Sequence, residues 1–323
     1  KAFAGRHPGC AGVIITDHGH YTLTADHRHV YRYHFVGYLL SDEVLSWAQL
    51  QLGYSEGRSR RRILAARCLS PDGRVFDLDP AKVKRGVPSR GAVHFDPNAR
   101  QLSATIPGAE VGGLVEYITE YEAYNKEDWR LFFPGFYFQM DQPCLSSRLK
   151  ITVPRNQALY SWTENWEAAG ESAARGESTE TSAPDGTPMR TWTWHRTEVP
   201  PVVSEPQMPP NNEIVPSMHA SLFENWDYLN DFLGTLQRER MEATPAVKEK
   251  TREILAGLER TEERVAALYH WVQKNIRYVS IKGSLSSGWT GHPAAETLAQ
   301  GYGDCTDKSI LLATMLEVLG FDA

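Results

Sequence analysis

The chain has 323 residues, of which 41% are hydrophobic and 23% are charged, a balance typical of globular proteins with buried cores. Its formal net charge of −6 argues against a nucleic-acid partner, and no apolar run approaches the ~18 residues that a membrane-spanning helix needs. The length suffices for two domains. The residues from Lys1 to Arg6 contain no hydrophobic signal segment, but a mature exported protein would begin in the same way, so the compartment stays open.

Residues 1–199 are predicted to form a β-rich domain. Short alternating runs such as His27–Phe35 and Leu114–Tyr124 are separated by turn signals, of which Ser70-Pro-Asp-Gly73 is the strongest, and convincing helices are few. This pattern predicts an antiparallel β-sandwich-like domain. The aromatic residues between Leu131 and Met140 are expected to form core, and the Ala-, Ser-, Thr- and Glu-rich residues 168–189 a long loop.

The histidines and cysteines of the chain are candidate metal ligands. An alternating His-x-His pair on a strand points both imidazoles to one face, yet no cysteine or carboxylate follows at ligand spacing, so we favour a polar sheet face and expect no metal and no cofactor. The absence of a C-x-x-C motif argues against a zinc ribbon or a disulfide framework, although one disulfide among the first three cysteines stays open. The residues concerned are His18, His20, His27, His29, His34, Cys10, Cys68, Cys144 and Cys305.

Six prolines between Pro200 and Pro216 predict an extended connector, so residues 200–220 are interpreted as a proline-rich linker. Helical patterns follow it. Ser221-Leu-Phe-Glu224 has the form of a capping box, and Thr244-Pro245 and Thr261 are expected to begin two further helices. Residues 221–323 therefore predict the helical start of an α+β domain.

Cys305 lies at the expected start of the last helix, whose apolar residues recur at three- and four-residue spacing up to Gly320. Unpaired N–H groups and the helix dipole at this end favour a thiolate, which is the nucleophilic form. Gly301 and Gly303 leave a bare backbone that another group can approach closely. A buried structural cysteine is the alternative, but the Gly-x-Gly-Asp-Cys context favours a nucleophile.

The segment from Gly301 to Ala323, which begins Gly-Tyr-Gly-Asp-Cys-Thr-Asp-Lys-Ser, resembles the nucleophile segment of the bacterial transglutaminase-like superfamily. Trp271–Val279 is similar to the helix and strand that precede the cysteine in that family, whose core is shared with papain-like thiol enzymes. The resemblance implies a Cys-His-Asp triad with Cys305 as nucleophile. Because the family carries its His and Asp after the cysteine helix, both are expected downstream of Ala323, and residues 1–323 alone are expected to be inactive.

Two side chains compete to complete an oxyanion site with the backbone N–H of Cys305. Trp289 resembles the tryptophan that transglutaminases place near the thiol, and Gln300 lies close to where papain-like enzymes carry a glutamine. His270 and His292 are interpreted as bystanders, because the base in the family comes from downstream. Asp304 and Asp307 are interpreted as structural acids that suit the helix dipole.

The N-terminal half carries a looser resemblance. Pro71–Val75, Ile106-Pro-Gly and Phe133-Pro-Gly-Phe-Tyr-Phe138 resemble an uncharacterised β-rich domain that often precedes transglutaminase-like domains in bacterial proteins. The resemblance implies a β-rich fold for this part of the chain but indicates little about its chemistry. It also favours a periplasmic or cell-envelope location.

The sequence is compatible with two alternative functions. The first is a transglutaminase-like cysteine enzyme that acts on amide bonds of protein or peptide substrates, by hydrolysis or by acyl transfer through a Cys305 thioester. The second is a non-catalytic binding or scaffold protein of the cell envelope with an inert transglutaminase-like domain. Because the last helix would lack the sheet on which it packs, we also expect exposed apolar surface there, or an oligomer contact that covers it.

Overall fold

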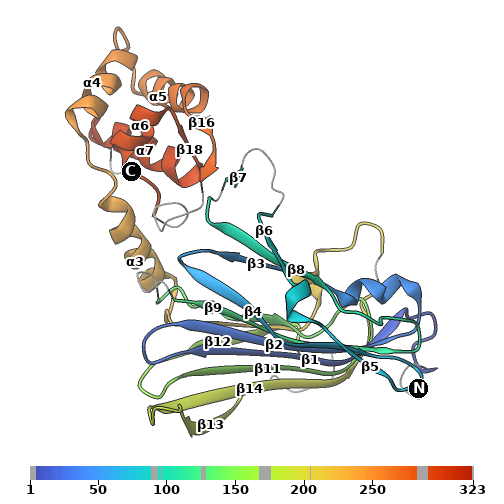
Figure 1. The fold of residues 1–323 in the computed structure, drawn as a ribbon. Coiled ribbons are helices and arrows are strands. Elements are labelled where there is room, and N and C mark those ends of the chain that lie inside the picture. Colours follow the sequence, from blue (N-terminus) through green and yellow to red (C-terminus); the bar gives the residue numbers. More distant parts are fainter. Residues whose placement is uncertain are drawn as a thin grey trace. The chain divides into compact units, whose positions relative to one another are not determined.

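The computed structural model describes residues 5–88, 94–95, 97–124, 129–166, 176–203, 205–281 and 290–321. The chain divides into two compact units (Figure 1). The N-terminal unit comprises Lys1–Pro88 with Arg100–Phe223, and the C-terminal unit comprises Ser89–Ala99 with Glu224–Ala323. The first unit is β-rich and the second is mainly helical.

The N-terminal unit is built on an eight-stranded sheet of order β13-β14-β11-β1-β2-β9-β4-β5. Neighbouring strands in it run antiparallel, with the exception of β1 and β11, which pair in parallel. The strands are β1 (Gly12–Leu23), β2 (His29–Leu39), β4 (Ser59–Leu69), β5 (Val75–Asp77), β9 (Leu114–Ala123), β11 (Cys144–Pro154), β13 (Glu177–Ser182) and β14 (Pro188–Val199).

Two three-stranded sheets, of order β10-β15-β12 and β3-β8-β6, complete this unit. The first contributes Phe136 and Met218 to a core shared with Leu149 and Ile151 of the large sheet, so the two sheets pack face to face. This agrees with the sandwich-like fold expected from the sequence. The remaining elements are β3 (Gln49–Ser55), β6 (Lys84–Gly86), β8 (Ala99–Thr105), β10 (Gly135–Tyr137), β12 (Tyr160–Glu164), β15 (Ser217–Ser221), η1 (Asp42–Ala48), η2 (Pro80–Lys82) and α2 (Asn211–Ile214).

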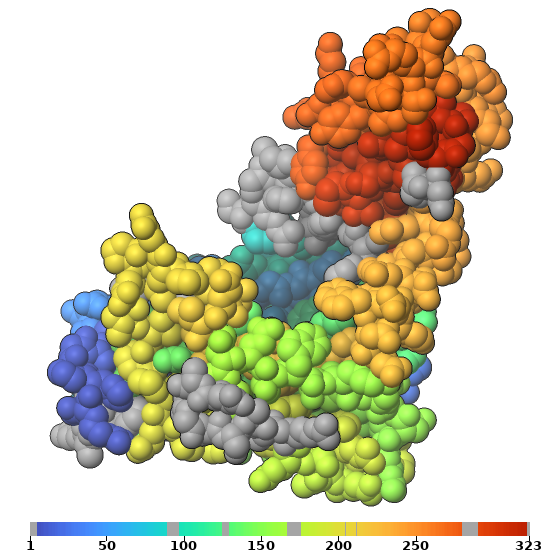
Figure 2. Space-filling view, turned by 180° about the vertical axis from the view of Figure 1, so that it is seen from behind, coloured from blue at the N-terminus to red at the C-terminus, as the bar shows by residue number. Residues whose placement is uncertain are grey.

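The segment interpreted as a linker differs from that expectation. Residues 200–220 include α2 and most of β15. β15 is the central strand of its sheet, and its residues Met218 and Ala220 both point into the core. The proline-rich part runs beside the residues that follow β10, since the Val202 N–H donates to the Met140 carbonyl (2.7 Å), and Figure 2 shows yellow and green parts of the N-terminal unit on one surface. No proline follows Pro216 in this segment, so the later residues keep the backbone N–H groups that strand pairing needs.

Two further expectations are corrected. Ser221-Leu-Phe-Glu224 does not begin a helix: Ser221 ends β15, and α3 (Trp226–Arg238) begins after Asn225, whose side chain accepts from the Tyr228 N–H (2.9 Å). Within residues 168–189, expected to be a loop, Glu177–Ser182 forms β13, paired with β14. An edge strand can be polar along its whole length, because hydrogen bonds to the neighbouring strand hold it in the sheet and neither of its faces has to be buried.

One face of the large sheet is polar, and it carries His18, His20 and His34, whereas His29 contacts Phe132 of the core on the other face. His18 lies opposite His34, and His20 opposite Arg32, on the strands β1 and β2. His18 and His20 contact the hydroxyls of β11, and His34 contacts Glu116 (2.9 Å). The imidazoles are therefore held by hydroxyl and carboxylate partners. No group of three or more metal-ligating side chains occurs among the residues described, and all four cysteines are free thiols.

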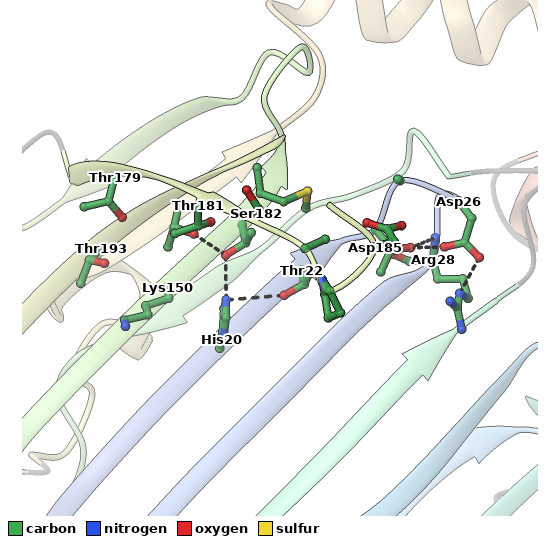
Figure 3. Close-up of a pocket in the computed structure, with 17 residues that line it drawn as sticks. His20, Thr22, Asp26, Arg28, Lys150, Thr179, Thr181, Ser182, Asp185 and Thr193 are labelled. Carbon is green, nitrogen blue, oxygen red and sulfur yellow. Dashed lines mark hydrogen bonds and ion pairs between the residues drawn. The ribbon is translucent and has the colours of Figure 1, made fainter. Parts of the chain in front are cut away.

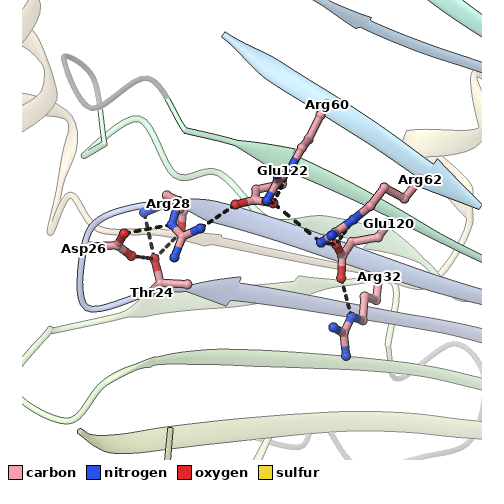
Figure 4. Close-up of polar contacts among 8 residues, drawn as sticks. All are labelled: Thr24, Asp26, Arg28, Arg32, Arg60, Arg62, Glu120 and Glu122. Atoms are coloured by element: carbon pink, nitrogen blue, oxygen red, sulfur yellow. Dashed lines mark hydrogen bonds and ion pairs between the residues drawn. The ribbon is translucent and has the colours of Figure 1, made fainter. Parts of the chain in front are cut away.

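A ladder of ion pairs crosses this polar face (Figure 4). The carboxylate of Glu120 on β9, 2% exposed, accepts from Nε of Arg32 on β2 (2.6 Å) and from Nε of Arg62 on β4 (2.9 Å). Each buried carboxylate is shared by two guanidinium groups, so the ladder ties three strands together and carries a net positive charge. The second rung joins Glu122 to Arg28 and Arg60.

Asp17 of β1 is a buried carboxylate that is 1% exposed. Burial raises its pKa to about 6, in opposition to hydrogen bonds from Ser147 Oγ (2.7 Å) and Tyr33 OH (2.8 Å) that lower it. Because the pKa is raised in the folded state, the stabilising contribution of this group is complete below pH 3.8 and is lost as the pH rises through 6. At neutral pH the ionised Asp17 therefore lowers the free energy of unfolding, by up to about 3 kcal/mol.

We expect Asp17→Asn to unfold at a higher urea concentration than the wild type at pH 7.5, and the difference to narrow at pH 5, because the amide cannot ionise. Urea titrations followed by tryptophan fluorescence at both pH values measure this. The exposed Asp77→Asn is the control and should shift neither transition. A variant that is destabilised equally at both pH values would show that the hydrogen bonds of Asp17, and not its charge, dominate.

The C-terminal unit packs four helices around one core: α4 (Pro245–Ile254), α5 (Thr261–Asn275), α6 (Ala294–Gln300) and α7 (Cys305–Glu317). α4 begins as expected, with Thr244 as cap and Pro245 in the first turn. Leu268 and Val272 of α5 pack on Ile310, Leu311 and Met315 of α7. The short strands are β7 (His94–Phe95) with β17 (Ser280–Ile281), and β16 (Arg277–Tyr278) with β18 (Tyr302–Gly303), each pair parallel. No described helix has the length and hydropathy of a membrane span.

Candidate functional site

Cys305 is the first residue of α7, and its side chain is exposed. The residue before it, Asp304, is the helix cap: Oδ1 accepts from the N–H groups of Thr306 (3.0 Å) and Asp307 (3.3 Å). Asp307 Oδ2 accepts in return from the Asp304 N–H (2.9 Å), which completes a capping box. The position of the thiol at a helix start agrees with the sequence prediction.

The same capping leaves one backbone donor beside the thiol. The N–H groups of Thr306 and Asp307 are occupied by Asp304, and that of Lys308 donates to the Asp304 carbonyl (3.1 Å). Within the described part of the chain, the Cys305 N–H has no acceptor. A carbonyl oxygen that approaches the thiol would therefore meet an unoccupied donor at the positive end of the helix dipole.

Asp307 also binds the loop before α6. Its Oδ1 accepts from the His292 N–H (2.7 Å) and from His292 Nδ1 (3.0 Å), and the residue is 3% exposed. A carboxylate only accepts, so Nδ1 carries the hydrogen of this bond. His292, interpreted from the sequence as a bystander to the catalysis, is joined by these bonds to the first turn of the cysteine helix. We call Asp304, Asp307 and His292 the helix-start clasp.

Two glycines allow the clasp to close. A Cβ at Gly303 would lie 2.6 Å from Asp307 Cβ, and a Cβ at Gly291 would lie 2.5 Å from Ile310 Cδ1. Gly291 also has a φ of +66°, which favours glycine. The sequence suggested that the glycines near Cys305 admit an incoming group, but Gly303 is occupied by the packing of Asp307, and Gly301 (φ +69°) ends α6.

Lys308 ties the cysteine helix to α5. Its Nζ donates to the carbonyls of Ile276 (2.8 Å) and Gln273 (3.4 Å), which lie at the C-terminal end of α5 where the dipole is negative. The Ser309 hydroxyl donates to the Cys305 carbonyl (2.8 Å). β18, directly before Asp304, pairs with β16, so the chain is held on both sides of the thiol.

The two side chains predicted to complete an oxyanion site have different outcomes. Gln300, the last residue of α6, is exposed and donates through Nε2 to Glu296 Oε1 (2.8 Å) on its own helix. Trp289 lies outside the described residues. Both roles remain predictions.

Two family models match this chain. A family model described as a domain of unknown function, DUF3857, matches residues 25–203. The chain belongs to the DUF3857 family. Residues 248–323 of this DUF3857 protein match the Transglutaminase-like superfamily, so Cys305 and the clasp lie within a transglutaminase-like domain. A search of curated proteins finds no match.

Among solved structures, a candidate protease from Parabacteroides distasonis is similar over 96% of this chain, with 17% identity and a TM-score of 0.75. This shows a common fold. The chain spans 59% of the length of that structure. A CBM3a-L domain of a Clostridium thermocellum scaffoldin (12% identity, 37% of this chain, 71% of that one) and a candidate nutrient-binding protein of Legionella pneumophila (8%, 96% and 94%) have TM-scores of 0.22 and 0.24, too low to support an argument.

Proposed function

We propose that this protein is a transglutaminase-like thiol enzyme that acts on amide bonds of protein or peptide substrates through Cys305. The observation that supports it best is the exposed thiol at the first residue of α7, beside its own unoccupied backbone N–H. These are the nucleophile and one oxyanion donor that acyl transfer requires.

In the proposed reaction the Cys305 thiolate adds to the amide carbonyl, and the oxygen that becomes negative accepts from the Cys305 N–H. The C–N bond then breaks, and the amine leaves with a proton from a general acid. The resulting thioester is attacked by water in hydrolysis or by a second amine in transfer, and the thiolate is regenerated. The resemblance implies that the base is a histidine after the cysteine helix, oriented by an aspartate. Gln300 and Trp289 are proposed as further oxyanion donors.

The test uses the complete native protein with dimethylated casein, in the presence and absence of a fluorescent primary amine. Incorporation of the amine that depends on Cys305 supports transfer, and cleavage or ammonia release that depends on Cys305 supports hydrolysis. An acyl adduct on Cys305, identified by mass spectrometry after acid quench, would identify the thioester in either case. The absence of all three would favour the alternative, a binding or scaffold protein of the cell envelope.

A further inference from the structure

A groove of about 920 Å³ lies on the polar face of the large sheet (Figure 3). Its floor is formed by side chains of β1, β11 and β14. One wall is β13 with the turn that joins it to β14, and one end is closed by the turn after β1. Its volume is that of pockets that hold small ligands. The groove lies entirely in the N-terminal unit, so it is independent of the Cys305 site.

Three side chains on the floor of the groove, those of His20, Thr152 and Thr191, are joined by short polar contacts. His20 Nε2 lies 2.8 Å from Thr152 Oγ1, which in turn lies 2.8 Å from Thr191 Oγ1. Burial lowers the pKa of His20 to about 4, assisted by the charges of Lys150, Arg32 and Arg148, so the imidazole carries no charge at neutral pH. These three side chains hold one another in place without a ligand and carry no net charge, so Lys150 is the charged side chain of the floor.

Two opposite charges in the groove are uncompensated. Within the described ranges, neither the Lys150 ammonium nor the Asp185 carboxylate has an ion-pair partner; Asp185 Oδ1 accepts from the Thr187 N–H (3.0 Å). The nearby charges are paired: Asp26 binds Arg28, which also binds Glu122. Figure 3 shows Lys150 and Asp185 toward opposite ends of the groove, with His20 and Thr22 between them.

The groups between these charges are hydroxyls. Side chains of Thr179, Thr181, Ser182 and Thr193 line the groove, and each hydroxyl can both donate and accept. Amide N–H and C=O groups need this mixture of partners. A ligand that suits the groove therefore carries an anion at one end, a cation at the other and amides between.

We propose that the groove binds a short peptide with free ends, its carboxylate at Lys150 and its ammonium at Asp185. A neutral saccharide would leave both charges uncompensated, and a simple acid would satisfy Lys150 alone. Lys150 lies opposite Thr193, and Asp185 lies beyond Pro188 of the same strand, so the two charges are separated by at least the rise of five strand residues, roughly 16 Å, which an extended pentapeptide spans.

Calorimetric titration of the chain with penta-alanine tests the proposal. The Cys305→Ala variant is used throughout, so that the peptide stays intact and the result does not depend on the proposed enzyme activity. Acetylation of the peptide's amino end and amidation of its carboxyl end are each expected to weaken binding roughly tenfold, because each removes one charge contact.

Substitutions of Lys150 and Asp185 test which charge binds which end of the peptide. In Lys150→Met the free and amidated peptides should bind equally, and in Asp185→Asn the free and acetylated peptides should bind equally. Lys84→Met, which removes an exposed lysine on β6, is the matched control and should leave all affinities unchanged. Equal binding of doubly capped penta-alanine, tighter binding of the neutral saccharide penta-N-acetylchitopentaose, or no binding of penta-alanine at millimolar concentration would each overturn the proposal.

Discussion

Replacement of Cys305 by alanine is expected to lower the rate of amide hydrolysis or acyl transfer by the complete native protein by about 10³-fold or more. The reason is chemical: without the thiol no thioester forms, and only the oxyanion donor and substrate binding remain to accelerate the reaction. The measurement is kcat/KM for whichever reaction dimethylated casein reports. Because the Cys305 side chain is exposed, its removal leaves no cavity, and the variant should fold.

Cys10→Ala is the matched control, since Cys10 is a free, half-buried thiol in the N-terminal unit. It should keep the wild-type rate. Cys305→Ser should retain the helix start and lose most of the rate, because a hydroxyl is a weaker nucleophile than a thiolate. A Cys305→Ala protein as active as the wild type would refute the proposed function and leave the binding protein as the better hypothesis.

Replacement of Asp307 by alanine is expected to destabilise the start of α7 by about 3–5 kcal/mol. The carboxylate accepts three hydrogen bonds, two from His292 and one from the Asp304 N–H, in a site that is almost completely buried. Its loss leaves buried donors unsatisfied and opens the clasp. The measurement is native-state hydrogen exchange of residues 301–317, which should speed up by two or more orders of magnitude.

Glu317→Ala on the last turn of the same helix is the control for that experiment. Glu317 is exposed and lies where the dipole disfavours an acid, so its removal should leave exchange at residues 301–317 unchanged or slightly slower. Asp307→Asn should fall between the wild type and Asp307→Ala, because an amide keeps one acceptor. Wild-type protection in Asp307→Ala would show that the core contacts of Ile310 and Met315 hold the helix start without the clasp.

The sequence predicted the cysteine helix well because the information is local. Apolar residues at helical spacing and an aspartate before Cys305 specify a helix and its cap within a few residues. Asp304 and Asp307 were interpreted as structural acids, and their spacing is itself a capping-box signal. The bond from Asp307 to His292 could not be predicted in the same way, because the partners lie fifteen residues apart and meet only through the loop before α6.

The two strands of the N-terminal unit that were not predicted from the sequence, β13 and β15, lack a clear local signal. β13 is polar along its whole length, and β15 follows a proline-rich stretch, so neither carries the alternating pattern of a long half-buried strand. Their neighbours supply what the local sequence lacks: β14 provides the hydrogen bonds of β13, and the core of the large sheet accepts Met218 and Ala220 of β15.

By itself, the sequence determined the β-rich and helical halves, the start of α7 and the place of the thiol at that start, because hydrophobic period and capping act over a single turn or strand. Only the tertiary structure decided which charges are compensated. Lys150 and Asp185 are ordinary surface residues in the sequence; the pairing of β11, β14 and β13 brings them into one groove, while Arg28 is occupied by Asp26 and Glu122. Charge compensation depends on contacts between distant strands, and no local pattern encodes it.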